Sequence, residues 1–234
     1  MLTDASIHLY PSFGAAPTEA YICAQMCQVL LRDGISHALV LEDFDPASEF
    51  FSEFFLNAEI SRKSLQKALG GAFSKMSILH SGVLPLRSVM MAEPYLQRLT
   101  LGSDRLLPIS IPGGCFSAEE ETAYGYLLKH RVTPLLVHFE EACLLASPKE
   151  VDRLIHLPHA VYLLSPKAFE LEVLFPVWEK MIALRREMVL GSCARDPSAC
   201  QKLHDRTFAS SRGKSLYSCV KRFSTAYFSK GVFD

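Results

Sequence analysis

The stretch that decides the fold is residues 18–45, TEAYICAQMCQVLLRDGISHALVLEDFD, in which a helix-sized segment precedes a strand-sized one. Apolar residues recur every three or four positions between Thr18 and Arg32, which is typical of an amphipathic helix, and Gly34 marks its end. His37–Leu41 then has the length and composition of one buried strand, and acidic residues follow it. This helix–strand unit predicts an α/β fold.

The same alternation extends through the rest of the chain. Further strands are expected at Ser6–Leu9, Ser77–His80, Arg87–Met91, Leu106–Ile111, Pro134–His138, Ala160–Leu164 and Met188–Gly191. Further helices are expected at Phe50–Leu56, Ser61–Leu69, Ser117–His130, Pro148–His156, Lys167–Arg185, Ser198–Phe208 and Lys214–Phe228. Ser117, followed three residues later by Glu120, forms a capping-box pattern at a helix start.

Repeated strand-then-helix units predict a mainly parallel sheet that is buried on both faces. About seven such strands without an internal break favour a distorted (β/α) barrel. The sequence contains neither a linker-like segment nor a low-complexity run, so residues 1–234 are expected to form a single domain.

The composition is that of a globular protein and disfavours several classes of partner. A hydrophobic content of 49% is enough to fill a core, and the formal net charge of -1 gives no electrostatic reason to expect nucleic acid or an anionic membrane. No apolar run is long enough for a spanning helix, and the first residues lack the pattern of a secretory signal. The seven cysteines are odd in number and show no CxxC spacing, so reduced thiols and a cytoplasmic location are expected.

Polar side chains stand where the predicted strands end, which is where function concentrates in β/α barrels. His8 closes the first strand, Asp43 follows the second, Glu93 follows Arg87–Met91, and His138 follows Pro134–Val137. Two histidines and two carboxylates at successive strand ends are the ligand types that a hard or borderline metal ion needs. Because any barrel of this size carries polar residues there, the pattern alone leaves a metal site open.

These strand ends also resemble the motifs of the bacterial PHP-type (polymerase and histidinol phosphatase) tyrosine phosphatases linked to capsule synthesis. Residues 7–11 (IHLYP) resemble the end of D-x-H-x-H-x-L-P, and the order and spacing of four further segments agree, namely 34–40 (GISHALV), 91–93 (MAE), 136–140 (LVHFE) and 190–195 (LGSCAR). The resemblance extends over roughly residues 5 to 210. It implies a PHP-like barrel, a metal cluster that binds phosphate and activates water, and a bacterial setting near exopolysaccharide synthesis with a phosphotyrosine-bearing kinase as partner.

The resemblance transfers only part of the ligand set to this chain. His8, Glu93 and His138 match family ligands, and Asp43 stands where the family has a histidine. Repulsion between two cations would be poorly offset by so few ligands. We therefore expect one divalent ion (Mn, Fe or Zn) bound by these four residues, or none.

Other positions of the family pattern have changed. Ser6 replaces a histidine, residues 14–16 (GAA) replace an acidic pair, and Cys193 and Arg195 replace an aspartate and a histidine. Arg195 is either an anion holder, which takes the place of a lost cation or binds a phosphate, or a surface arginine beside Asp196. Cys193 is either a soft ligand for zinc or an inert buried thiol.

Three functional hypotheses follow. The first is a PHP-like relative of the metal-dependent protein-tyrosine phosphatases with weak activity or none. The second is an active phosphoesterase with one metal ion. The third is a non-catalytic regulatory module that binds a phosphorylated protein or a small phosphoester through Arg195. The sequence does not indicate an oligomeric state.

Overall fold

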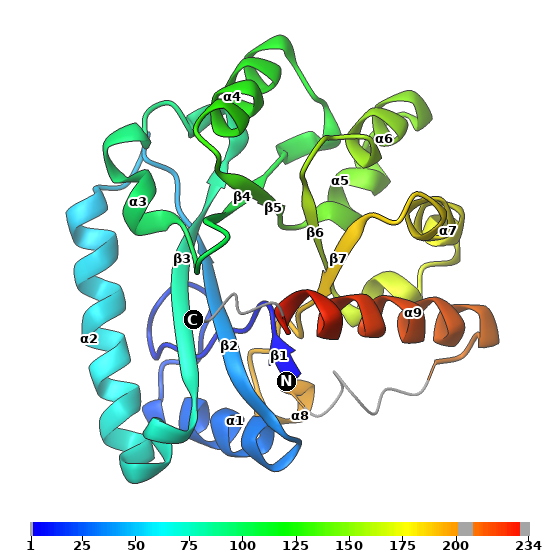
Figure 1. Ribbon diagram of the computed structural model, residues 1–234. Helices are drawn as coiled ribbons and strands as arrows, with labels where there is room; N and C mark the ends of the chain where they lie inside the picture. The colour runs from blue at the N-terminus through cyan, green and yellow to red at the C-terminus, as the bar shows by residue number, and fades with distance from the viewer. Residues whose placement is uncertain (1, 201–207, 230–234) are drawn as a thin grey trace.

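The computed structural model describes residues 2–200 and 208–229, and its centre is a sheet of seven strands arranged in chain order (Figure 1). The strands are β1 Leu2–Asp4, β2 Ile35–Asp43, β3 Ser77–Pro85, β4 Leu106–Ser110, β5 Thr133–Leu136, β6 Val161–Leu164 and β7 Glu187–Leu190. Each strand pairs in parallel with the next one along the chain. The sheet curves into a nearly closed barrel, so the predicted distorted (β/α) barrel is confirmed.

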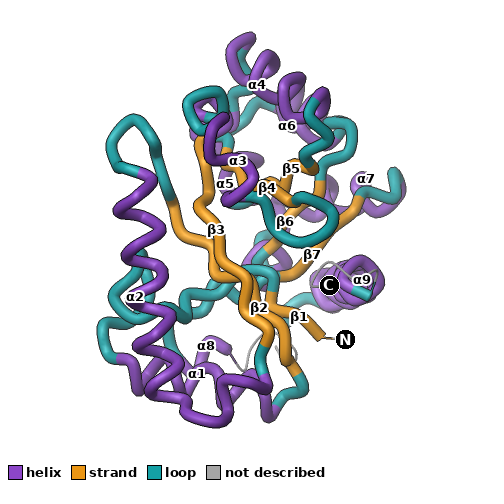
Figure 2. The backbone as a smooth tube through the Cα atoms, turned by 60° about the vertical axis from the view of Figure 1, so that its left-hand side comes forward, coloured by secondary structure: helices purple, strands orange, loops and turns teal. Residues whose placement is uncertain are grey.

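Helices surround the strands (Figures 1 and 2). They are α1 Ala20–Arg32, α2 Phe51–Leu69, α3 Leu96–Leu99, α4 Ala118–Lys129, α5 Phe139–Leu145, α6 Pro148–Ile155, α7 Phe175–Ala183, α8 Pro197–Cys200 and α9 Ser211–Phe228. The predicted capping box begins α4: the Glu120 backbone N–H donates to Ser117 Oγ at 3.3 Å, and the Ser117 N–H donates to Glu120 Oε2 at 2.7 Å. Within the described ranges, no helix has the length and apolarity that a bilayer crossing requires.

Two predicted strands are wrong. Residues 87–91 form turns that begin with the 3-10 helix Leu86–Ser88, because β3 is longer than expected and ends at Pro85. Val89 is fully buried within this turn, and a short apolar run does not by itself distinguish a strand from a buried turn. The segment Ser6–Leu9 follows the first strand, and only Ile7 pairs there, in a parallel bridge with Ala194.

Four predicted helices differ in extent or lie partly outside the described residues. The two expected within residues 50–69 are one continuous helix, α2, whose buried face includes Phe54, Ala58 and Leu65. The long helix expected from Lys167 shortens to α7, which carries a proline in its first turn and follows two 3-10 turns. Of the helix expected at Ser198–Phe208, residues 201–207 lie outside the described part of the chain.

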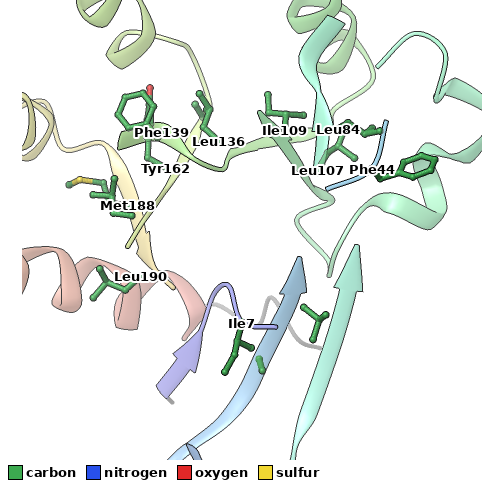
Figure 3. Close-up of a cluster of buried hydrophobic side chains, with 14 of the residues drawn as sticks. Ile7, Phe44, Leu84, Leu107, Ile109, Leu136, Phe139, Tyr162, Met188 and Leu190 are labelled. Atoms are coloured by element: carbon green, nitrogen blue, oxygen red, sulfur yellow. The ribbon is translucent and has the colours of Figure 1, made fainter. Parts of the chain in front are cut away.

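Buried apolar side chains form two layers, one inside the barrel and one between the strands and the helices. Along β2 the layers alternate: Leu39 and Leu41 belong to the inner cluster, whereas Ala38 and Val40 belong to the outer one. Figure 3 shows members of the outer cluster on several strands, among them Ile109, Leu136 and Tyr162. The strands are therefore buried on both faces, as parallel strands covered by helices must be.

The gap between the last strand and the first is closed by α9 and by the segments that follow β1 and β7 (Figure 1). The Ala5 N–H donates to the Leu190 carbonyl at 3.0 Å, and the Leu190 N–H donates to Ser224 Oγ of α9 at 3.1 Å. Tyr227 and Phe228, near the end of α9, belong to the inner cluster. They pack in this cluster with Leu101 and Leu106, so α9 helps to fill the interior of the barrel.

Candidate functional site

A cavity of about 800 Å³ lies at the carboxyl ends of the strands; we call it the barrel mouth. Its polar lining comes from the end of β2 and from the segments that follow β1, β5, β6 and β7. It includes Ser6, His8, Glu42, Asp43, His138, Glu140, Glu141, Ser165, Lys167, Ser192, Cys193, Arg195 and Asp196. Four of the five residues that the sequence singled out for a site, namely His8, Asp43, His138 and Arg195, lie here. This is the position at which β/α barrels carry their functional groups.

One pair at the mouth is buried. His8 Nδ1 lies 2.7 Å from Glu42 Oε1, and the side chains are 12% and 2% exposed, respectively. The other oxygen of Glu42 accepts the Ala15 backbone N–H at 2.9 Å. Gly14 packs so closely on this carboxylate that a Cβ there would lie 2.0 Å from Glu42 Oε2. The loop after β1 and the end of β2 therefore fix the Glu42 carboxylate, and this carboxylate holds the His8 ring at Nδ1.

A second pair at the mouth is exposed. His138 Nε2 lies 3.4 Å from Asp43 Oδ1, and the side chains are 43% and 81% exposed. The hydrogen bond to Asp43 raises the pKa of His138, and the same bond lowers the pKa of Asp43. His138 has a left-handed backbone (φ 56°) at the start of α5, which turns its ring towards the end of β2.

Beneath the mouth lies a buried carboxylate that the sequence analysis missed. Asp4 is fully buried; its Oδ1 accepts the N–H groups of Ser192 (2.8 Å) and Ser6 (3.2 Å), and its Oδ2 accepts the Ser192 hydroxyl at 2.5 Å. Burial raises the pKa of Asp4 to about 6, against these hydrogen bonds, which lower it. Asp4 thereby fastens the segment after β7, which carries Arg195, to the segment after β1.

Cys193 also joins the segment after β7 to the segment after β1. Its N–H donates to the Ser6 carbonyl at 2.8 Å, and its Sγ lies 3.7 Å from Ser6 Oγ. Burial raises the pKa of the thiol to about 12, so the sulfur is protonated at neutral pH. Cys193 as a whole residue is exposed, so the inert alternative of a buried thiol is not met, and a soft-ligand role for its sulfur stays a prediction.

The structure does not bring Glu93 to the mouth. Glu93 is exposed in the 3-10 turn Glu93–Tyr95, and its carboxylate interacts with the hydroxyl of Tyr126 on α4, which contributes to the raised pKa of that phenol after desolvation. The prediction placed Glu93 after a strand at Arg87–Met91. Since that segment is a turn, the chain leaves the mouth before it reaches Glu93.

The residues at the mouth do not fit a centre with four protein ligands. Among the described residues, no three or more His, Cys, Asp or Glu side chains are grouped in a way that could hold a metal ion. His8 Nδ1 and both oxygens of Glu42 are engaged within the protein, and Asp43 and His138 pair with one another. A metal ion on His8, Asp43 and His138 stays a prediction that would require these side chains to rearrange.

The fold is shared with known enzymes, although the sequence is remote from them. A solved structure from the work on YwqE from Bacillus subtilis and CpsB from Streptococcus pneumoniae, two metal-dependent tyrosine phosphatases, matches with a TM-score of 0.61 and 13% identity. The match covers 96% of this chain and 94% of the other. No protein-family model and no curated protein matches the sequence. The fold implied by the sequence motifs is thus confirmed, and at this identity the likeness concerns the fold alone.

Proposed function

We propose that this chain is a PHP-like relative of the metal-dependent tyrosine phosphatases that binds a phosphorylated ligand at the barrel mouth and has little or no metal-dependent phosphatase activity. One observation carries the proposal. The side chains that would have to hold metal ions are paired with one another or with the backbone, as His8–Glu42 and Asp43–His138, and Glu93 lies elsewhere.

The charges at the mouth support a phosphate ligand. Arg195 and Lys167 line the cavity, and a guanidinium binds phosphate through two parallel hydrogen bonds. Five carboxylates also line the cavity, and four of them are engaged: Asp43 with His138, Glu42 with His8, Glu140 through an N–H donated by Ser165 at 3.2 Å, and Asp196 through an N–H donated by Ala199 at 2.9 Å; the fifth is Glu141. Repulsion of an anionic ligand is thereby reduced.

The biological setting is proposed on the sequence resemblance. The protein would act in the bacterial cytoplasm as a single barrel domain over residues 1–234, near exopolysaccharide synthesis. Its ligand would be a phosphotyrosine-bearing protein or a small phosphoester.

Metal analysis and phosphatase assays test the catalytic half of the proposal. Protein purified without chelator should carry metal well below one ion per chain, and added manganese should produce no multiple-turnover hydrolysis of p-nitrophenyl phosphate above the buffer rate. A stoichiometric ion that is lost in His138→Ala, together with manganese-dependent hydrolysis, would instead establish the active phosphoesterase with one metal ion.

Ligand binding tests the other half. A phosphotyrosine peptide should bind in the presence of EDTA, and Arg195→Ala should weaken its binding about tenfold or more, the loss expected for one charge-assisted contact. Arg32→Ala is the matched control, because Arg32 is an exposed arginine of α1 that pairs with Asp33 and does not line the mouth. Equal affinity in Arg195→Ala and Arg32→Ala would contradict the proposed role of Arg195.

A further inference from the structure

We propose that His8 is a phosphoryl acceptor whose Nε2 attacks a phosphate monoester bound at the barrel mouth, without the help of a metal ion. This inference rests on the proposed function, since it requires a phosphorylated ligand in the same cavity. It assigns to the His8–Glu42 pair a chemical role in place of the metal-ligand role that the family resemblance implies.

The hydrogen bond of His8 fixes which ring nitrogen is reactive. The Glu42 carboxylate accepts hydrogen bonds, so the 2.7 Å contact places the proton of a neutral His8 ring on Nδ1. Nε2 then carries the lone pair, and it makes no hydrogen bond with the described residues. A histidine whose second nitrogen is held by a carboxylate is the arrangement that activates this side chain as a base or a nucleophile.

The loop after β1 is shaped around this pair. Ala15 donates its backbone N–H to the second oxygen of Glu42, and the positive φ of Gly14 (58°) lets the loop pass against the same carboxylate. A side chain at position 14 would occupy the position of the carboxylate. The carboxylate is thus held at both oxygens, and His8 cannot lose its partner without movement of the loop.

The phosphate would be bound beside this nucleophile. Lys167 and Arg195 line the same cavity as His8, so two cationic side chains lie at the mouth together with the nucleophile. Cations placed there stabilise the charge on the equatorial oxygens of a phosphoryl group in transfer.

The transfer balances without another reactant. The Nε2 lone pair forms the N–P bond while the bond from phosphorus to the ester oxygen breaks, and the alkoxide or phenoxide leaves with that electron pair and takes a proton from water. The Nδ1 proton stays in its hydrogen bond to Glu42, whose charge offsets the positive charge that develops on the ring. Cys193 is the other candidate nucleophile at the mouth, but its raised pKa keeps it as the poorly reactive thiol.

The experiment uses the full chain in EDTA with p-nitrophenyl phosphate as phosphoryl donor. We expect one equivalent of nitrophenolate per chain and one phosphoryl group on His8, stable to alkali and labile to acid, located by mass spectrometry. Glu42→Gln should slow this labelling about 100-fold, the size of a general-base contribution, because the amide can donate to Nδ1 and so move the proton to Nε2. His130→Gln, outside the mouth, is the control.

The outcomes separate this inference from the function on which it rests. A wild-type protein that binds the phosphopeptide but is not labelled overturns the phosphoryl-acceptor role and leaves the proposed function standing. Label on any residue other than His8, or labelling that is equally fast in Glu42→Gln, also overturns it. If neither binding nor labelling is found, the proposed function fails as well. The wild-type labelling decides the question even if a variant does not fold.

Discussion

The two histidine–carboxylate pairs at the barrel mouth contain the same chemical groups in different surroundings. His8–Glu42 is almost fully buried and joins two segments 34 residues apart, with a backbone N–H on the second carboxylate oxygen. Asp43–His138 is exposed and longer, and water can replace either partner. Burial therefore gives the first pair a fixed geometry and a high cost of disruption, whereas the second pair can open to a ligand.

The largest expected effect on stability comes from removing the buried histidine, His8, and the exposed histidine, His138, provides the comparison. His8→Ala should lower the free energy of unfolding by about 3 kcal/mol, because it leaves a buried carboxylate without its side-chain partner. His138→Ala should lower it by less than about 1 kcal/mol, because the pair is exposed. Urea denaturation of both variants checks this, and equal losses would remove the distinction between the pairs.

The buried carboxylate below the mouth should give the next largest effect, seen in the pH dependence of stability. The pKa of Asp4 is raised from 3.8 to about 6 in the folded protein, so the folded state retains a proton that the unfolded state loses. Stability should then fall as the pH rises from about 4 to 6, by about 3 kcal/mol, at about 1.4 kcal/mol per pKa unit. Asp4→Asn should lack this fall, and parallel stability profiles for the two proteins would contradict it.

Alanine substitutions at two glycines of positive φ, Gly14 and Gly113, test how tightly the His8–Glu42 pair is enclosed. Gly14→Ala should cost about 2 kcal/mol, from the positive φ of 58° and from the clash with Glu42. Gly113→Ala should cost only the backbone strain of about 1 kcal/mol, because its φ is 75° but no atom lies within 4 Å of the added Cβ. Thermal unfolding of both variants gives the difference, which should vanish if the loop at Gly14 is free to move.

The smallest effect belongs to the exposed pair. Its stabilisation should be complete between about pH 4 and 6.5, lost at lower pH as Asp43 is protonated through its lowered pKa, and lost at higher pH as His138 deprotonates through its raised pKa. Asp43→Asn should bring the pKa of His138 back towards the ordinary histidine value. NMR titration of the His138 ring checks this, and an unchanged titration would show that another group raises its pKa.

Much of the architecture was predictable because it depends on local patterns. Helical periodicity located α1, the capping box at Ser117 located the start of α4, and repeated strand–helix units gave the parallel order of the strands. The convergence of His8, Asp43 and His138 on one cavity followed from their places after strands. The error at Arg87–Met91 arose because a buried turn and a strand share the same short apolar pattern. Because Glu93 was expected at the end of that strand, its predicted position at the mouth was wrong as well.

The sequence by itself determined the α/β alternation, the barrel and which strand ends would carry polar groups, since these depend on residues near one another in the chain. Only the tertiary structure decided how those polar groups are paired. The Glu42 carboxylate forms hydrogen bonds with His8 Nδ1 and the Ala15 N–H. The Asp4 carboxylate accepts one from the Ser192 N–H, 188 residues away in the chain. No local sequence pattern encodes these contacts. Whether a carboxylate at a strand end binds a metal ion, a histidine or a backbone N–H depends on which neighbours the closed barrel brings within hydrogen-bonding distance.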